Sequence, residues 1–302
     1  MAVSSATADT KVKIRRASSL ALAWRRFLRQ RWAVVCGICI LLELVIAIAA
    51  PLIAPYGPYY SDYTATYKPP SSKHLMGTDD LGRDVLSRVI YGTRVSYAVG
   101  VLSQIAVVII GLPIGAVAGL LGGWVDYLIM RVIDILSSVP GLLLYILLMV
   151  ALGGGSANIY RALGNIILAM SITGWIGIAR LVRGQVLSIK ESDYVRASRS
   201  MGAKNGWIIR THIIRNSLTP VVVSMTLGVP GAMFAEAGLS FLGLGIAPPT
   251  PSWGQMIGIY QTYARAWPHL ILYPAIVLAV TMLFWIVLGD GVRDALDPNI
   301  RM

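Results

Sequence analysis

The sequence predicts an all-α polytopic membrane protein with six transmembrane helices, and three observations support this fold class. Hydrophobic residues make up 56% of the 302-residue chain, and charged residues only 13%. Soluble domains carry about 25% charged residues. The mean hydropathy is +0.68. Long apolar runs alternate with polar segments, and since each span needs about 20 apolar residues, the chain has room for about six spans and their loops.

The positive charge of the chain predicts its orientation in the membrane. The formal net charge is +12, but the Lys and Arg residues lie beside apolar runs, and they do not form an aromatic-interleaved basic module. We therefore expect no nucleic-acid partner. With six spans and the N-terminus inside, nineteen of the 26 Lys/Arg residues fall on cytoplasmic segments and seven fall outside. This excess predicts that both termini lie in the cytoplasm.

The N-terminal segment, residues 1–31, is predicted to be a basic cytoplasmic tail. Within it, Leu20–Arg31 could form an amphipathic helix on an anionic membrane surface. Alternatively, its charge only orients the protein. The apolar run that follows is longer than the hydrophobic part of a signal peptide, so we expect it to be retained as a span.

The first span is predicted over Trp32–Ala54, within a region, residues 32–94, that also contains an external segment. Cys36 and Cys39 lie in this span. No further cysteine could complete a metal site, so we expect both to be small helix-packing residues. Glu43 lies in the middle of the span, where a carboxylate is costly in lipid. It should face the solute pathway or a helix-packing contact.

The external segment combines turn residues with a cluster of charges. We expect Asp80 or Asp84 to cap a short helix at the membrane face. Four side chains could alternatively be imagined as metal ligands: His74, Asp79, Asp80 and Asp84. Three arginines nearby favour internal ion pairs over a metal site: Arg83, Arg88 and Arg94.

Five further spans follow, and several of their residues carry structural expectations. The spans are predicted at Val95–Leu121, from about residue 132 to Leu152, at Leu163–Leu181, at Leu218–Phe241 and at His269–Gly289. Small residues every fourth position allow close helix packing in the first of these runs: Gly111, Gly115 and Gly119.

Charged and special residues in the third and fifth spans suggest roles in packing or in the pathway. Arg131 and Asp134 lie one turn apart and are expected to pair. Pro140 is expected to kink its helix. Glu236 is a second intramembrane carboxylate, in the pathway or in helix packing. Trp253, in a Pro/Gly-rich stretch, is expected to anchor at the membrane interface.

The longest basic interruption, Glu191–Pro220, is predicted to be a cytoplasmic loop for a soluble partner. No Gly-Lys pair exists in the chain, so it lacks a phosphate-binding loop of the P-loop type. No relay of ionisable residues runs through the spans, and no inverted repeat is evident. Uphill transport would therefore draw energy from another subunit. A stand-alone channel or secondary carrier is the competing class.

Within this loop, Arg196-Ala197-Ser198 followed by Gly202 resembles the conserved loop of bacterial binding-protein-dependent ABC importer permeases. Arg196 stands where that family usually has Glu, and His212–Arg215 stands where the pattern ends in a proline, with Pro220 five residues later. Three other stretches resemble the second, C-type permease of the dipeptide, oligopeptide and nickel importers: Gly77–Ser96, Met130–Leu144 and Glu236–Ile257. The resemblance extends from about Trp24 to the C-terminus.

This resemblance implies a type I importer permease in the bacterial inner membrane. The core would be residues 95–302, with five spans and a coupling loop at 186–216, preceded by an extra N-terminal span. The implied partners are a second permease, two ATPase subunits and an external solute-binding protein. The chain itself would be non-catalytic and cofactor-free, with ATP and Mg²⁺ in the ATPases. The solute would be a peptide or, alternatively, nickel or another small ligand.

The family also implies which loop residues contact the ATPase. Small residues allow a close approach, glycine allows a sharp turn, and Tyr194, Val195 and Met201 offer an apolar side to the partner. The expected coupling residues are Tyr194, Arg196, Ala197, Ser198, Met201 and Gly202.

Overall fold

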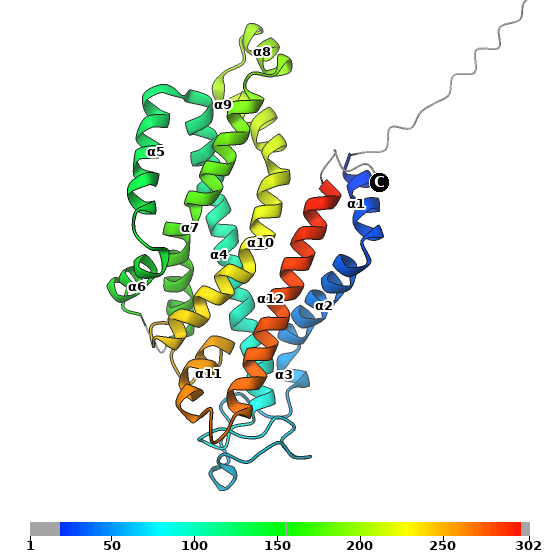
Figure 1. Cartoon of the computed structure of the whole chain (residues 1–302), viewed down its shortest axis with the longest axis vertical. Helices are drawn as coiled ribbons and strands as arrows, with labels where there is room; N and C mark the ends of the chain where they lie inside the picture. Colours follow the sequence, from blue (N-terminus) through cyan, green and yellow to red (C-terminus); the bar gives the residue numbers. More distant parts are fainter. Residues whose placement is uncertain (1–18, 155, 157, 297–302) are drawn as a thin grey trace, which may run out of the picture.

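The computed structural model describes residues 19–154, 156 and 158–296, and this part of the chain is built from helices (Figure 1). The helices are α1 (Ser19–Arg29), α2 (Arg31–Ile48), α3 (Ala50–Ile53), α4 (Val85–Leu121), α5 (Gly123–Ser137), α6 (Gly141–Ala151), α7 (Ile159–Ile189), α8 (Asp193–Ser200), α9 (Asn205–Ile208), α10 (Ile214–Phe241), α11 (Trp253–Tyr260) and α12 (His269–Leu296). A π-helical turn, Ile209–Ile213, joins α9 to α10 without a break.

Five helical stretches of the described chain are long and apolar enough to cross a membrane. They are α2, α4, α7, the continuous stretch from α9 through α10, and α12. A sixth crossing exists if the bent pair of α5 and α6 counts as one span. The all-helical membrane fold predicted from the sequence is therefore confirmed.

Helix α4 is longer than the span predicted for it. The expected short surface helix and the second span form one helix of 37 residues. Its start was foreseen, because the Asp84 carboxylate accepts a hydrogen bond from the Ser87 backbone N–H at 2.8 Å and caps the first turn. Nothing after the cap breaks the helix until Gly122, so the separate surface helix was wrong.

The glycine stripe of α4 lies against α7, as its spacing predicted. A Cβ atom at Gly115 would lie 2.4 Å from the Ala179 carbonyl oxygen, and one at Gly111 would lie 2.7 Å from the Trp175 carbonyl oxygen. Only a residue without a side chain permits this approach of two backbones. Helices α4 and α7 are therefore held close together by the glycine residues of α4.

The third span is broken at Pro140, where the sequence predicted only a kink. Helix α5 ends at Ser137, and α6 starts at Gly141 at an angle of 88° to it. Proline disfavours helical geometry in the residue before it and lacks a backbone N–H. Pro140 instead occupies the N-cap position of α6, where a missing N–H is tolerated.

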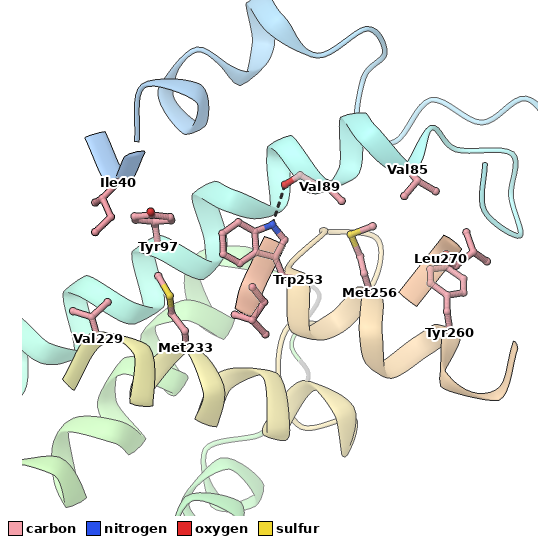
Figure 2. Packing of buried hydrophobic residues seen from close by; sticks show 11 residues of the cluster. Ile40, Val85, Val89, Tyr97, Val229, Met233, Trp253, Met256, Tyr260 and Leu270 are labelled. Atoms are coloured by element: carbon pink, nitrogen blue, oxygen red, sulfur yellow. Dashed lines mark hydrogen bonds between the residues drawn. The ribbon is translucent and has the colours of Figure 1, made fainter. Parts of the chain in front are cut away.

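Trp253 is a core residue, which corrects its predicted role as an interface anchor. Its side chain is fully buried, and its indole Nε1–H donates a hydrogen bond to the Val89 carbonyl oxygen at 3.1 Å. Figure 2 shows the ring between α4 and α11, with Tyr97 and Met233 nearby. The indole partner lies on the distant helix α4, so the local Pro/Gly-rich context could not reveal it.

The predicted external segment, residues 55–84, is fastened to α4 and α11 by a buried polar network. Asp79 accepts hydrogen bonds from Arg83 Nε at 2.6 Å and from the Tyr260 hydroxyl at 3.0 Å. Arg88 Nε lies 3.6 Å from the same carboxylate. Burial disfavours the charged form of Arg83, but attraction to Asp79 and Tyr260 outweighs it and raises the pKa of the guanidinium.

His74 and Asp84 form a second contact in this network, with 2.9 Å between Nδ1 and Oδ1. Arg83 and Arg88 pair with Asp79, as the nearby arginines had suggested. Among the described residues, no group of three or more His, Cys, Asp and Glu side chains is arranged to hold a metal ion.

Candidate functional site: a loop of short helices between α7 and α10

The loop predicted to couple to an ATPase folds as two short helices, α8 and α9. Figure 1 shows α8 at one end of the molecule, opposite the external segment. The loop needs no proline to start the next span, because α9 passes through the π-helical turn directly into α10. The fifth span therefore starts earlier than Leu218, the residue predicted from the apolar run.

One face of the loop is packed against the helices that carry it. Val195, Ile208 and Ile213 are fully buried, in one cluster with Val182 and Val186 of α7. Val195 was expected to offer apolar surface to a partner, but it serves the chain's own core. Burial of such side chains stabilises by about 1.5–3 kcal/mol each, so the loop has a defined position on the protein.

The opposite face leaves large side chains uncovered. Met201 is 81% exposed, Trp207 51% and Tyr194 45%. Ala197 is also exposed. A hollow of about 460 Å³ lies between the two short helices and is lined by Ser198, Met201, Gly202, Ala203, Lys204 and Trp207. An exposed aromatic and methionine surface around a hollow is typical of a protein contact site.

Gly202 makes the turn between the two helices. Its φ of +86° lies in the left-handed region, which side chains with a Cβ rarely adopt. A Cβ added there would meet no atom within 4 Å. The glycine is thus required by the backbone turn and not by crowding inside this chain, and the space beside it is open to a partner.

Ser198, one of the expected ATPase contacts, lines the hollow but is largely covered by its own chain. It is 5% exposed. Its hydroxyl donates to the Tyr194 carbonyl oxygen at 2.8 Å and lies 3.1 Å from His212 Nε2. The His212 ring is 5.3 Å from the ring of Tyr194 and 5.2 Å from that of Trp207. His212 therefore joins both halves of the loop, a role that its place in the sequence did not indicate.

Arg196 lies on the exposed side of α8 and bonds to Glu191. Its Nη2 donates to the Glu191 carboxylate at 2.8 Å, and both side chains are more than 60% exposed. The hydrogen bond from Arg196 lowers the pKa of Glu191 below its usual value. An exposed pair of this kind contributes little to stability, so Arg196 remains available to a partner.

The two intramembrane carboxylates lie in helix packing. Glu43 of α2 accepts hydrogen bonds from the Tyr97 hydroxyl of α4 and from Thr281 Oγ1 of α12, the latter at 2.9 Å. Glu236 of α10 is 1% exposed and accepts from Ser240 at 2.7 Å and from Ser252 at 2.9 Å. Each carboxylate thus joins separate elements of the fold.

Arg131 and Asp134 do not form the pair that the sequence predicted. Arg131 reaches back one turn, where its Nη2 donates to the Tyr127 hydroxyl at 3.1 Å and its guanidinium lies over the same ring. Asp134 instead accepts from Arg180 of α7 at 3.2 Å. Arg180 of the neighbouring helix binds Asp134 in place of Arg131, and the spacing of residues along α5 could not reveal this partner.

Two family models match the chain. The model of the binding-protein-dependent transport system inner membrane component matches residues 111–302. The model of the N-terminal TM domain of oligopeptide transport permease C matches residues 18–70. The second match covers the predicted extra N-terminal span, and the first covers most of the remaining helices.

Curated relatives match over most of their lengths. The chain is 46% identical to the dipeptide transport system permease protein DppC of Bacillus subtilis, over 92% of the chain and 85% of the relative. It is 43% identical to the oligopeptide transport system permease protein OppC of Bacillus subtilis, over 92% and 89%. It is 40% identical to the glutathione transport system permease protein GsiD of Pectobacterium atrosepticum, over 92% and 90%.

A solved structure with the same fold is the inward-facing MetNI methionine ABC transporter. One of its chains aligns with a TM-score of 0.57 at 18% identity, covering 70% of this chain and 96% of that one. An amino acid ABC transporter solved with histidines aligns with a TM-score of 0.51 at 16% identity, covering 69% and 94%. These likenesses concern the fold of the helical core.

Proposed function

The chain belongs to the family of binding-protein-dependent transport system inner membrane components, and on that premise we propose that it forms half of a channel for dipeptides or oligopeptides. It is a permease subunit of a bacterial ABC importer and a multi-pass protein of the inner membrane. The proposal of a peptide solute is supported by relatives named for dipeptides, oligopeptides and glutathione.

The coupling loop, residues 186–216, docks an ATPase subunit in this proposal. The exposed surface of Tyr194, Met201 and Trp207 around the hollow is the observation that carries it. A rigidly seated loop with an uncovered apolar face can transmit a push from a partner to α7 and α10, from which it extends. ATP and Mg²⁺ bind in the partner ATPases, and this chain performs no catalysis.

The docking proposal fixes the membrane orientation. The loop must lie in the cytoplasm, where ATP is available, so the N- and C-termini lie there too and the external segment faces the solute-binding protein. The excess of Lys and Arg on the same side supports this arrangement. The full assembly would contain a second permease and two ATPase subunits, one for each permease.

The exposed charges on α5 and α7 favour these helices as the wall of the solute pathway. Asp134 is 60% and Arg180 48% exposed at the side chain, and Arg131 is exposed as well. Charges within membrane spans are costly against lipid and usually face water or protein. Glu43 and Glu236, in contrast, are engaged inside the fold. Arg131 and Asp134 are therefore the better pathway candidates.

Reconstitution of the whole assembly tests this function. The chain, its second permease, both ATPases and the solute-binding protein are placed in liposomes, and labelled dialanine is supplied outside with ATP inside. We expect uptake that needs ATP and the binding protein. Uptake of nickel but not of dialanine would show that nickel, and not a peptide, is the transported solute. ATP-independent uptake by the chain alone would support a channel or secondary carrier instead.

A further inference from the structure

A cleft of about 310 Å³ lies on the external side, where the external segment meets residues 91–95 of α4 and the first turn of α7. Its lining residues are Pro58, Tyr59, Tyr91, Arg94, Val95, Ile159, Tyr160, Leu163, Thr250 and Pro251. The volume is at the lower end of the range of about 300–1,000 Å³ found for small-molecule pockets. The cleft lies apart from the coupling loop and from the charges of α5.

Arg94 is the one charged residue in this lining. It is exposed, and within the described part of the chain its guanidinium has no ion pair or hydrogen bond. The neighbouring arginines differ, because Arg83 and Arg88 both lie against Asp79. The acidic residues of the external segment are thus engaged elsewhere, and the guanidinium of Arg94 is available to bind a ligand.

The walls of the cleft suit a small amphipathic ligand. Three tyrosines, at 59, 91 and 160, supply hydroxyl donors, and no hydrogen bond by these hydroxyls is found among the residues that the structure describes. Val95, Ile159 and Leu163 supply an apolar floor. Tyr91, Arg94 and Val95 share one face of α4, because residues three and four apart on a helix are neighbours.

Two loops that close the cleft are held by Arg88, one residue of the buried network. Arg88 Nη1 donates to the Pro58 carbonyl oxygen at 3.3 Å and to the Pro249 carbonyl oxygen at 3.4 Å. These residues directly precede Tyr59 and Thr250 of the lining. The cleft is therefore formed before a ligand arrives, which reduces the ordering cost of binding.

We infer that this cleft is an entry site that binds the terminal carboxylate of an incoming peptide through Arg94. The inference rests on the proposed import of peptides. A guanidinium matches a carboxylate with two parallel hydrogen bonds, and tyrosine hydroxyls add donors to the same group. The apolar floor receives the side chain of the last residue, while the rest of the peptide extends out of the cleft.

Protection of a single cysteine tests the site without requiring transport. The native cysteines, Cys36 and Cys39, are changed to serine, and Thr250→Cys places a thiol in the lining of the cleft. The complete transporter in liposomes is labelled from outside with a charged thiol reagent, with dialanine or dialanine amide present. We expect dialanine to slow labelling and the amide, which lacks the carboxylate, to have little effect.

The same measurement with Arg94→Ala should lose the protection. Since a hydrogen bond to a charged group is involved, we expect roughly ten- to hundredfold more dialanine to be needed. Arg161→Ala removes a nearby external cation that is outside the lining and serves as the matched control. A second cysteine variant, Tyr63→Cys, places the thiol on the exposed external segment and should be labelled at the same rate with or without dialanine.

Three results would overturn the inference. They are equal protection by dialanine and its amide, unchanged protection after Arg94→Ala, and protection by the solute-binding protein alone, which would make the cleft a protein contact. Labelling can be measured in a transporter that imports nothing. Failure of the entry site and failure of the proposed function are therefore distinguishable.

Discussion

The two ends of the molecule are held together by different forces. At the external end, Asp79, Arg83 and Arg88 form a buried ionic network that links the external segment to α11. At the other end, the coupling loop rests on aliphatic packing and on polar contacts of Ser198 with His212 and of Tyr194 with Asn216. The external end is thus locked, while the coupling end leaves its large side chains uncovered.

This difference fits an external end that stays rigid and a coupling loop that receives force from a partner. Buried charges tolerate no separation, because each partner left alone carries a large desolvation penalty. Aliphatic packing has no such directional demand, so the loop can adjust slightly when a partner binds. The three variants below test this contrast, from the largest expected effect to the smallest.

Asp79→Ala should cause the largest loss of stability. It leaves Arg83 and Arg88 buried without their shared carboxylate, and breaking a buried pair in this way costs about 3–5 kcal/mol. The measurement is thermal unfolding of the purified protein in detergent. The matched control is Lys73→Ala, which removes the largely exposed partner of Asp62 at 3.8 Å; such a pair contributes at most about 1 kcal/mol. Equal losses of stability in both variants would remove the distinction between the buried ionic network and an ordinary surface ion pair.

Gly202→Trp should stop ATP-driven uptake while the membrane fold survives. The side chain would enter the hollow at which the ATPase is proposed to dock, and the left-handed turn would add about 1–2 kcal/mol of local strain. Uptake and thermal unfolding are measured together. Gly206→Trp places the same side chain in α9, at an exposed glycine with open space around it, and should reduce uptake less. Normal uptake by Gly202→Trp would argue against docking at this turn.

Glu236→Gln should have the smallest effect, a modest fall in uptake. Its Oε1 accepts both serine bonds, and its Oε2 has no hydrogen-bond partner among the described residues. An amide can keep Oε1 and put its NH₂ group at the unpaired position. Uptake of acidic, neutral and basic dipeptides by the variant is compared with the wild type. A change in the relative uptake of acidic and basic dipeptides would place Glu236 in the pathway instead.

The sequence was sufficient for the fold class and for the local signals. Apolar runs, the Asp84 cap and the glycine stripe of α4 act through neighbouring residues or simple periodicity, so they can be seen in one dimension. The lengths of α4 and α7 were underestimated because both helices extend beyond their apolar runs. Polar residues at these ends are stabilised by tertiary contacts that hydropathy does not detect.

The errors share one physical cause, which is competition from distant partners. Asp134 pairs with Arg180, and the Trp253 indole bonds to Val89, each from another helix. Val195 was expected to face a partner, yet it packs against α7 inside the protein. Small and apolar residues suit an interface and a core equally well, so only the three-dimensional arrangement separates the two.

Crosslinking at Met201 tests most directly whether the exposed face of the coupling loop contacts the ATPase. Both native cysteines are changed to serine, and a single cysteine is introduced by Met201→Cys or, as the buried control outside the hollow, by Val195→Cys. A short bifunctional reagent is applied to membranes that contain the complete transporter. We expect Met201→Cys to crosslink to an ATPase subunit and Val195→Cys to do so far less. Docking at the exposed face would be contradicted if Met201→Cys gave no ATPase crosslink, or if an impermeant reagent labelled it from outside intact cells.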